Sequence, residues 1–254
     1  MRPGMRDSVP LCRVAVALLV SVVAGWGQTF SITNLSSIPA YERYVFDGRG
    51  SKVSHLPVVM EYRVRNAGRE DAHWSVSASM KLRETLIEEE YEIRHANLLS
   101  NRFRRRQTFE RGTSESMHML DVDTRSDDPE EFIVGAIPAL MYILRTFPFD
   151  SPKGELRVRS PQQEKGHLNL RVRNRGKTVF NTEHFGDVAA WHLEVSLMVP
   201  VVGGLLPRLN YYFRDDAQKT LIGMKGVLPA TGQRLDVELH SYTTAEKVRG
   251  SGKK

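Results

Sequence analysis

Alternation of apolar and polar residues along short segments constrains this chain more than any other feature. In PVVMEYRVRN every second residue is apolar: Val58, Met60, Tyr62 and Val64. A period of two indicates a β-strand with one buried and one solvated face. Similar segments follow, most of them bounded by Gly, Pro, Asn or Asp: HWSVSASMKL, TLIEEEYEIRH, GELRVRS, GHLNLRVRN, KTVFNTEHFG, AAWHLEVSLMVP, PRLNYYFRDD, KTLIGMKGVLP and QRLDVELHSY. Short strands joined by tight turns, among them a turn centred on Gly176, predict an antiparallel sheet of about ten strands.

One stretch departs from this alternation: SDDPEEFIVGAIPALMYILRTFPFD, at 126–150. Asp127 or Asp128 suits a helix N-cap, and the proline after them suits a first helical turn. Pro138 lacks an N–H. We therefore expect either a kink at this proline or a short first piece, followed by a second helix that opens at Pro138 and ends near Arg145.

The apolar residues of this helix recur at helical spacing, so the helix needs an apolar surface beside it. The concave face of a curved sheet is the available surface. We therefore predict a mainly β fold, in which one curved antiparallel sheet forms a half-barrel or open barrel. The helix at 128–145 is expected to pack on its concave face.

The first residues have the order of a secretory signal peptide: basic residues, an apolar run, then small residues. The apolar run from 14 to 26 is shorter than the roughly 20 residues of a spanning helix. We expect a signal peptide at 1–28, a single β-rich domain at 29–245 and a basic flexible tail at 246–254. We therefore expect the protein to be exported to the periplasm, or to be anchored by its N-terminus if the signal is uncleaved. Cys12 is the only cysteine, so the mature chain would have no disulfide and no Cys-ligated metal.

The segment NRFRRRQ, at 101–107, concentrates positive charge, and we expect it in an exposed loop. Its basic residues could contact phosphate on a lipid head group or lipopolysaccharide, or bind another envelope protein: Arg102, Arg104, Arg105 and Arg106. The chain has no helix-turn-helix, zinc-finger or RNA-binding aromatic signature, so nucleic acid is not expected as a partner.

No catalytic constellation stands out in the sequence. The eight histidines form no H-x-H, H-x-x-E-H or H-E-x-x-H motif, although His184 and His192 lie across a turn and His192 shares a strand face with Glu194. There is no G-x-S-x-G elbow and no phosphate-binding glycine loop. The triplet Glu88 to Glu90 is typical of a solvated strand face. We therefore assign no catalytic residue, metal ligand or cofactor, and keep a His-metal hydrolase as a minor alternative.

Most of the chain, and best the part after Asp128, resembles a family of exported bacterial proteins that is itself a domain of unknown function. In that family an S-A-L-x-x-L-R helix precedes a strand, and a D-D hairpin and a final strand close the domain. The positions that carry the resemblance are Tyr142, Leu144, Arg145, Gly186, Asp215, Asp216 and Leu239. QKTLIG departs from the R-x-P-V of the family. The resemblance covers about 57–242 and implies fold and compartment without an activity. Curved sheets plugged by a helix are similar, at the level of fold, to periplasmic lipoprotein carriers.

The leading hypothesis is a non-catalytic envelope protein that binds an apolar ligand, a lipid or a lipidated partner, between helix and sheet. The residues expected to line the site are Leu140, Met141, Ile143, Leu144, Phe147, Trp191, Leu197, Tyr211 and Phe213. An ordinary packed core explains the same residues without a ligand. A third reading is a scaffold that binds another envelope protein through the basic segment or an edge strand.

Overall fold

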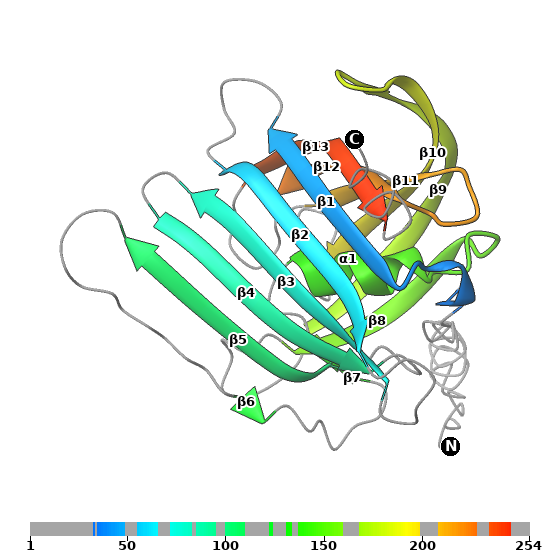
Figure 1. The fold of residues 1–254 in the computed structure, drawn as a ribbon. Coiled ribbons are helices and arrows are strands. Elements are labelled where there is room, and N and C mark those ends of the chain that lie inside the picture. Colours follow the sequence, from blue (N-terminus) through cyan, green and yellow to red (C-terminus); the bar gives the residue numbers. More distant parts are fainter. Residues whose placement is uncertain are drawn as a thin grey trace, which may run out of the picture.

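Among the described residues, the fold is one sheet of thirteen strands with a single α-helix lying against it and a short 3-10 helix, η1 Leu35–Ser37, before the first strand (Figure 1). The computed structural model describes residues 33, 35–48, 55–65, 72–82, 85–94, 100–109, 122–123, 131–133, 137–159, 168–198, 208–227 and 234–244. The predicted signal peptide, Cys12 and the predicted basic tail lie outside these residues. Asp127 and Asp128, expected to cap the helix, also lie outside them.

The strands follow one another across the sheet in the order β6-β5-β4-β3-β2-β1-β13-β12-β11-β10-β9-β8-β7. Their bounds are β1 Tyr41–Gly48, β2 His55–Arg65, β3 His73–Leu82, β4 Thr85–Arg94, β5 Ser100–Phe109, β6 Val122–Asp123, β7 Glu131–Ile133, β8 Lys153–Arg159, β9 Leu168–Thr182, β10 Gly186–Leu197, β11 Arg208–Arg214, β12 Leu221–Val227 and β13 Arg234–Thr244. All neighbours are antiparallel except β7 and β8. The sheet curls without closing into a barrel, which confirms the predicted fold class.

Strands β1 and β5 are among those that were not predicted, and one predicted turn is absent. Strand β1 was not predicted because a charged residue, Glu42, stands where the alternating pattern would require an apolar one. Strand β5 carries arginines on both parities, so it was expected to be a loop. The predicted turn at Gly176 is wrong: this glycine, with φ of 89°, lies in a bulge inside the fifteen-residue β9.

The helix is shorter than the predicted span of 128–145. It runs from Ile137 to Arg145 and is labelled α1. The part upstream that is described, Glu131–Ile133, is strand β7, which pairs in parallel with β8. Pro138 fits the first turn of α1, where its missing N–H costs nothing, and the expectation of a helix opening at this proline is confirmed. No helix in the described part of the chain is long and apolar enough to cross a bilayer.

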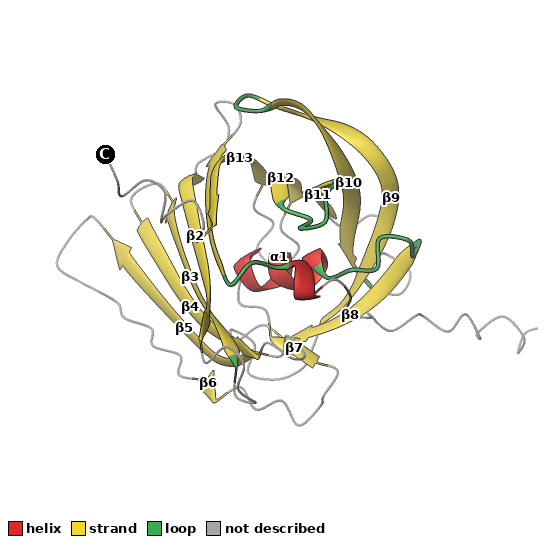
Figure 2. Cartoon of the chain, turned by 45° about the vertical axis from the view of Figure 1, so that its right-hand side comes forward, coloured by secondary structure: helices red, strands yellow, loops and turns green. Residues whose placement is uncertain are grey.

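Helix α1 lies inside the curl of the sheet, as Figure 2 shows. The ring of Tyr142 stacks on Tyr62 of β2, with ring centroids 4.5 Å apart, and also contacts Trp74 of β3. The turn after the helix brings Phe149 against Trp191 and Phe213 on the opposite half of the sheet. The helix and its following turn therefore connect the two halves of the curled sheet through their inner faces.

The long hairpin of β9 and β10 bends over the outer face of the sheet. Its Phe180 is buried and stacks on Tyr212 of β11 with ring centroids 4.3 Å apart. Phe180 lies over Gly223 of β12, where an added Cβ would be 2.4 Å from the ring. At the hairpin tip, the backbone N–H of Glu183 donates to the carboxylate of Glu238. Gly223 therefore provides the space that lets the hairpin dock.

We predict that Gly223→Ala destabilises the protein by about 1–3 kcal/mol, because the new methyl group overlaps the ring of Phe180. Urea unfolding measures this change. In a Phe180→Ala background the same substitution should cost at most about half as much, since the overlapping ring is gone. An equal cost in both backgrounds would contradict the docking role of Gly223.

Candidate functional site

The predicted apolar site residues all belong to one interior between α1 and the concave face. Those that are buried come from the helix, the following turn and β11: Met141, Ile143, Leu144, Phe147, Tyr211 and Phe213. The others are partly buried against the same core: Leu140, Trp191 and Leu197. A packed core requires such burial, so burial by itself does not distinguish a binding interior from an ordinary core.

A charge pair sits in the middle of this apolar interior. Arg145, the last residue of α1, donates from Nη1 to the carboxylate of Glu42 on β1, and both side chains are fully buried. The Nε of Arg145 donates to the backbone carbonyl of Gln218 at 2.6 Å. A cation at a helix C-terminus also interacts favourably with the helix dipole. The pair joins α1 to β1 and to the turn between β11 and β12.

Three tyrosine hydroxyls also donate hydrogen bonds to the carboxylate of Glu42. Tyr44 donates to one carboxylate oxygen at 3.2 Å, Tyr142 donates to the other at 3.3 Å, and Tyr242 donates to the first. Burial raises the pKa of all three phenols, so they remain protonated donors. Burial alone would lower the pKa of Arg145, but the neighbouring Tyr44 and Glu42 raise that pKa above its ordinary value. The carboxylate of Glu42 thus accepts hydrogen bonds from three phenols and from Arg145 in an apolar surrounding.

Two buried polar atoms of the interior have no hydrogen-bond partner among the described residues. They are Nη2 of Arg145 and the hydroxyl of Tyr211 on β11. Burial raises the pKa of Tyr211, so its hydroxyl also remains a donor. Buried polar groups are nearly always paired with protein or with a bound molecule. Each of these atoms therefore retains a donor that no described residue uses.

Several positions that carry the family resemblance have local structural roles. Gly186, with φ of 67°, follows the tip of the β9–β10 hairpin. Asp215 accepts from the indole of Trp191 and from Lys177, both at 2.7 Å, and the hydrogen bond from Lys177 lowers its pKa most. Asp216 accepts from the N–H of Lys219 in the turn after β11, which confirms the predicted D-D turn. Leu239 is a buried residue of β13.

The predicted basic loop is instead strand β5, and its charges are matched by those of β4. The register places Glu90 opposite Arg104 and Glu88 opposite Arg106. The corresponding nitrogen–oxygen distances are 3.6 Å and 3.9 Å. Arg102 and Arg105 lie on the same strand, and their side chains are outside the described part. The expectation of a loop is wrong because a run of arginines can pair as a strand beside a run of glutamates.

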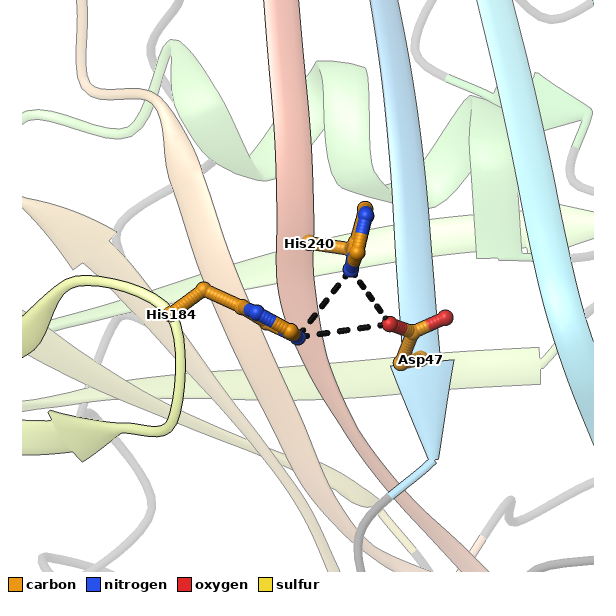
Figure 3. Close-up of side chains that lie close together, drawn as sticks. All are labelled: Asp47, His184 and His240. Atoms are coloured by element: carbon orange, nitrogen blue, oxygen red, sulfur yellow. Dashed lines mark hydrogen bonds and ion pairs between the residues drawn. The ribbon is translucent and has the colours of Figure 1, made fainter.

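A second group of side chains meets on the outer face, away from α1 (Figure 3). It comprises Asp47 of β1, His184 at the tip of the β9–β10 hairpin and His240 of β13. The Nδ1 of His240 lies 2.6 Å from Oδ2 of Asp47, and Nε2 of His184 lies 3.3 Å from the same oxygen. The two ring nitrogens are 3.1 Å apart. Three atoms that can ligate a metal thus converge at one place on the surface.

His192, which lies across a turn from His184 in the sequence, is not part of this group. His192 instead contacts Asn210 at 2.8 Å and stacks on Tyr212. The sequence offers no recognisable motif around Glu42, Tyr242, Asp47 or His240, so none of them was predicted as a site residue. Pairing of β1 with β13 brings these two strands together, and no local spacing indicates that pairing.

No family model matches the sequence, and no curated protein matches it. A solved structure that is similar is the beta-barrel-like protein of domain of unknown function DUF1849 from Brucella abortus. The TM-score is 0.46 at 7% identity, over 84% of this chain and 99% of that chain. That neighbour is described as a β-barrel-like protein of a domain of unknown function. At this level of similarity it carries no argument about the site.

We predict that Glu42→Gln destabilises the protein by about 3–5 kcal/mol, because it leaves the buried guanidinium of Arg145 without a counter-charge. Chemical denaturation followed by tryptophan fluorescence measures the loss. Glu61→Gln is the matched control, since Glu61 pairs with Arg63 on the solvated side of β2 at 3.0 Å, and should change stability by less than about 0.5 kcal/mol. Equal losses in the two variants would contradict a structural role for the buried pair.

Proposed function

We propose that the protein is a non-catalytic binding protein of the cell envelope that holds a lipid in the interior between α1 and the concave face of the sheet. The acyl chain would lie along the apolar inner residues. The polar head would accept hydrogen bonds from the buried donors of the interior. Export to the envelope rests on the order of residues 1–28 and is part of the same proposal.

The size of the apolar inner face supports this proposal. Thirteen strands about 4.8 Å apart span roughly 60 Å across the sheet, whereas a nine-residue helix is about 14 Å long. The inner faces of both halves carry buried apolar residues, such as Tyr91 and Ile93 on β4 and Leu170 and Val172 on β9. Because these residues are buried in the structure without a ligand, an acyl chain would have to enter between side chains that already cover one another. An extended apolar chain is a suitable complement to such a surface.

The observation that carries the proposal is the pair of unpartnered donors, the hydroxyl of Tyr211 and Nη2 of Arg145. A buried hydroxyl or guanidinium nitrogen without an acceptor costs free energy. A lipid head group offers oxygen acceptors, so binding would remove that cost for a donor it reaches. A fully apolar interior would have no such preference for an amphiphile over a plain hydrocarbon. The donors therefore favour a ligand with a polar head.

The alternatives differ in what the structure offers them. For a scaffold that uses the basic segment, Arg104 and Arg106 are already opposite glutamates of β4. This arrangement reduces the positive field available to an acidic partner. A filled core needs no ligand, but it would leave the two donors unsatisfied. A bound lipid accounts for both the extent of the apolar inner face and the two buried donors without a partner.

The test is native mass spectrometry of protein purified without detergent, followed by lipid extraction of the same sample. Delipidated protein is then titrated with a naturally fluorescent polyene fatty acid as a defined probe. The proposal expects a saturable complex with one or a few molecules of the probe and an adduct of lipid mass in the untreated sample. Absence of both the adduct and saturable probe binding would refute it.

We predict that Tyr211→Phe weakens binding of the probe several-fold, because it removes one buried donor while keeping the ring. Tyr212→Phe is the matched control: it lies next in sequence on β11, faces the outer surface and stacks on Phe180. It should leave probe binding unchanged. If both variants bind the probe like the parent protein and Tyr211→Phe is simply more stable, the hydroxyl has no ligand and the filled core is the better account.

A further inference from the structure

We propose that Asp47, His184 and His240 form a binding site for one divalent transition-metal ion, with Zn²⁺ as the ion that this donor set suits best. The inference is independent of lipid binding, since the group lies on the outer face of the sheet (Figure 3). Two imidazoles and a carboxylate are typical zinc ligands, and three protein ligands leave a position for water or an added ligand.

Two of the three distances within the group match a shared metal centre. Ligand atoms about 2.0–2.2 Å from a tetrahedral zinc ion lie roughly 3.3 Å from one another. The nitrogen of His184 is 3.3 Å from the carboxylate oxygen of Asp47 and 3.1 Å from the nitrogen of His240. The third distance, from His240 to Asp47, is 2.6 Å. A small rotation of the Asp47 carboxylate would widen this last distance to that of a coordinated pair.

Hydrogen bonding alone satisfies this arrangement poorly. If both ring nitrogens donate to Oδ2 of Asp47, two N–H groups face each other at a nitrogen–nitrogen distance of 3.1 Å. If one nitrogen is unprotonated, its lone pair lies beside the carboxylate instead of a donor. A cation in the centre interacts favourably with all three lone pairs at once. The convergence of the three atoms is therefore better explained by a metal than by pairwise hydrogen bonds.

The surrounding structure holds the three ligands in place from different elements. Asp47 and His240 lie on the neighbouring strands β1 and β13, which are paired along their length. His184 reaches them from the hairpin tip, next to Glu183, whose N–H donates to the buried Glu238 of β13. A bound ion would thus connect the β9–β10 hairpin to β1 and β13. Such a cross-link predicts that the metal stabilises the docked hairpin.

The experiment is isothermal titration of the purified protein, prepared without a polyhistidine tag and treated with a chelator, with Zn²⁺. Bound zinc is counted in parallel by elemental analysis. The proposal expects one equivalent of zinc and a rise in the thermal unfolding midpoint on zinc addition. Co²⁺ should give the visible absorption of a low-coordinate site with nitrogen ligands. Failure of the parent protein to bind a stoichiometric ion would overturn the proposal.

Two variants and one control assign the site. His240→Ala and Asp47→Asn should each weaken zinc binding by at least about 100-fold and remove the zinc-dependent thermal shift. His192→Gln is the control, because His192 lies on the same outer face but contacts Asn210 instead of the group, and it should bind zinc within about twofold of the parent. Circular dichroism in chelator establishes that all variants are folded. Equal weakening by His192→Gln, or unchanged binding by His240→Ala, would place the ion elsewhere and overturn the assignment.

Discussion

The structure depends on a buried charge pair that must form when the helix enters the sheet. Arg145 at the end of α1 and Glu42 on β1 are both without solvent contact, and either one alone in an apolar interior would be strongly unfavourable. Apolar packing is non-directional, whereas the hydrogen bonds of this pair have fixed geometry. The pair, together with Tyr44, Tyr142 and Tyr242, therefore sets where the helix lies along the concave face.

The same network explains which parts of the fold the sequence predicts. Alternation identified β2, where Met60 and Tyr62 face inward and Glu61 and Arg63 outward, because each parity has one character. It missed β1, whose inward parity begins with the charged Glu42. Local sequence patterns indicate where apolar side chains are buried. A charged residue that is buried because distant residues hydrogen-bond to it looks the same in the sequence as a solvated one.

The candidate sites differ in the same way. Helical spacing was sufficient to place Leu144 and Phe147 in the interior, since periodicity is a local property. The ligand-capable group on the outer face joins positions 47, 184 and 240, which meet only through the pairing of β1 with β13 and the bending of the β9–β10 hairpin. Neither event has a signature in residue spacing. The two faces of one sheet thus carry distinct chemistry: an apolar interior with buried donors on the inside, and a group of side chains able to ligate a metal on the outside.

The most direct measurement of the central claim is an experimental electron-density map of the protein purified without detergent, inspected around the unpartnered donors of Arg145 and Tyr211. The account predicts elongated density along the inner face beside α1, with a polar end within hydrogen-bond distance of one of these donors. Density for protein side chains in van der Waals contact throughout, with at most single waters at the two donors, would contradict it and show that the interior is a filled core.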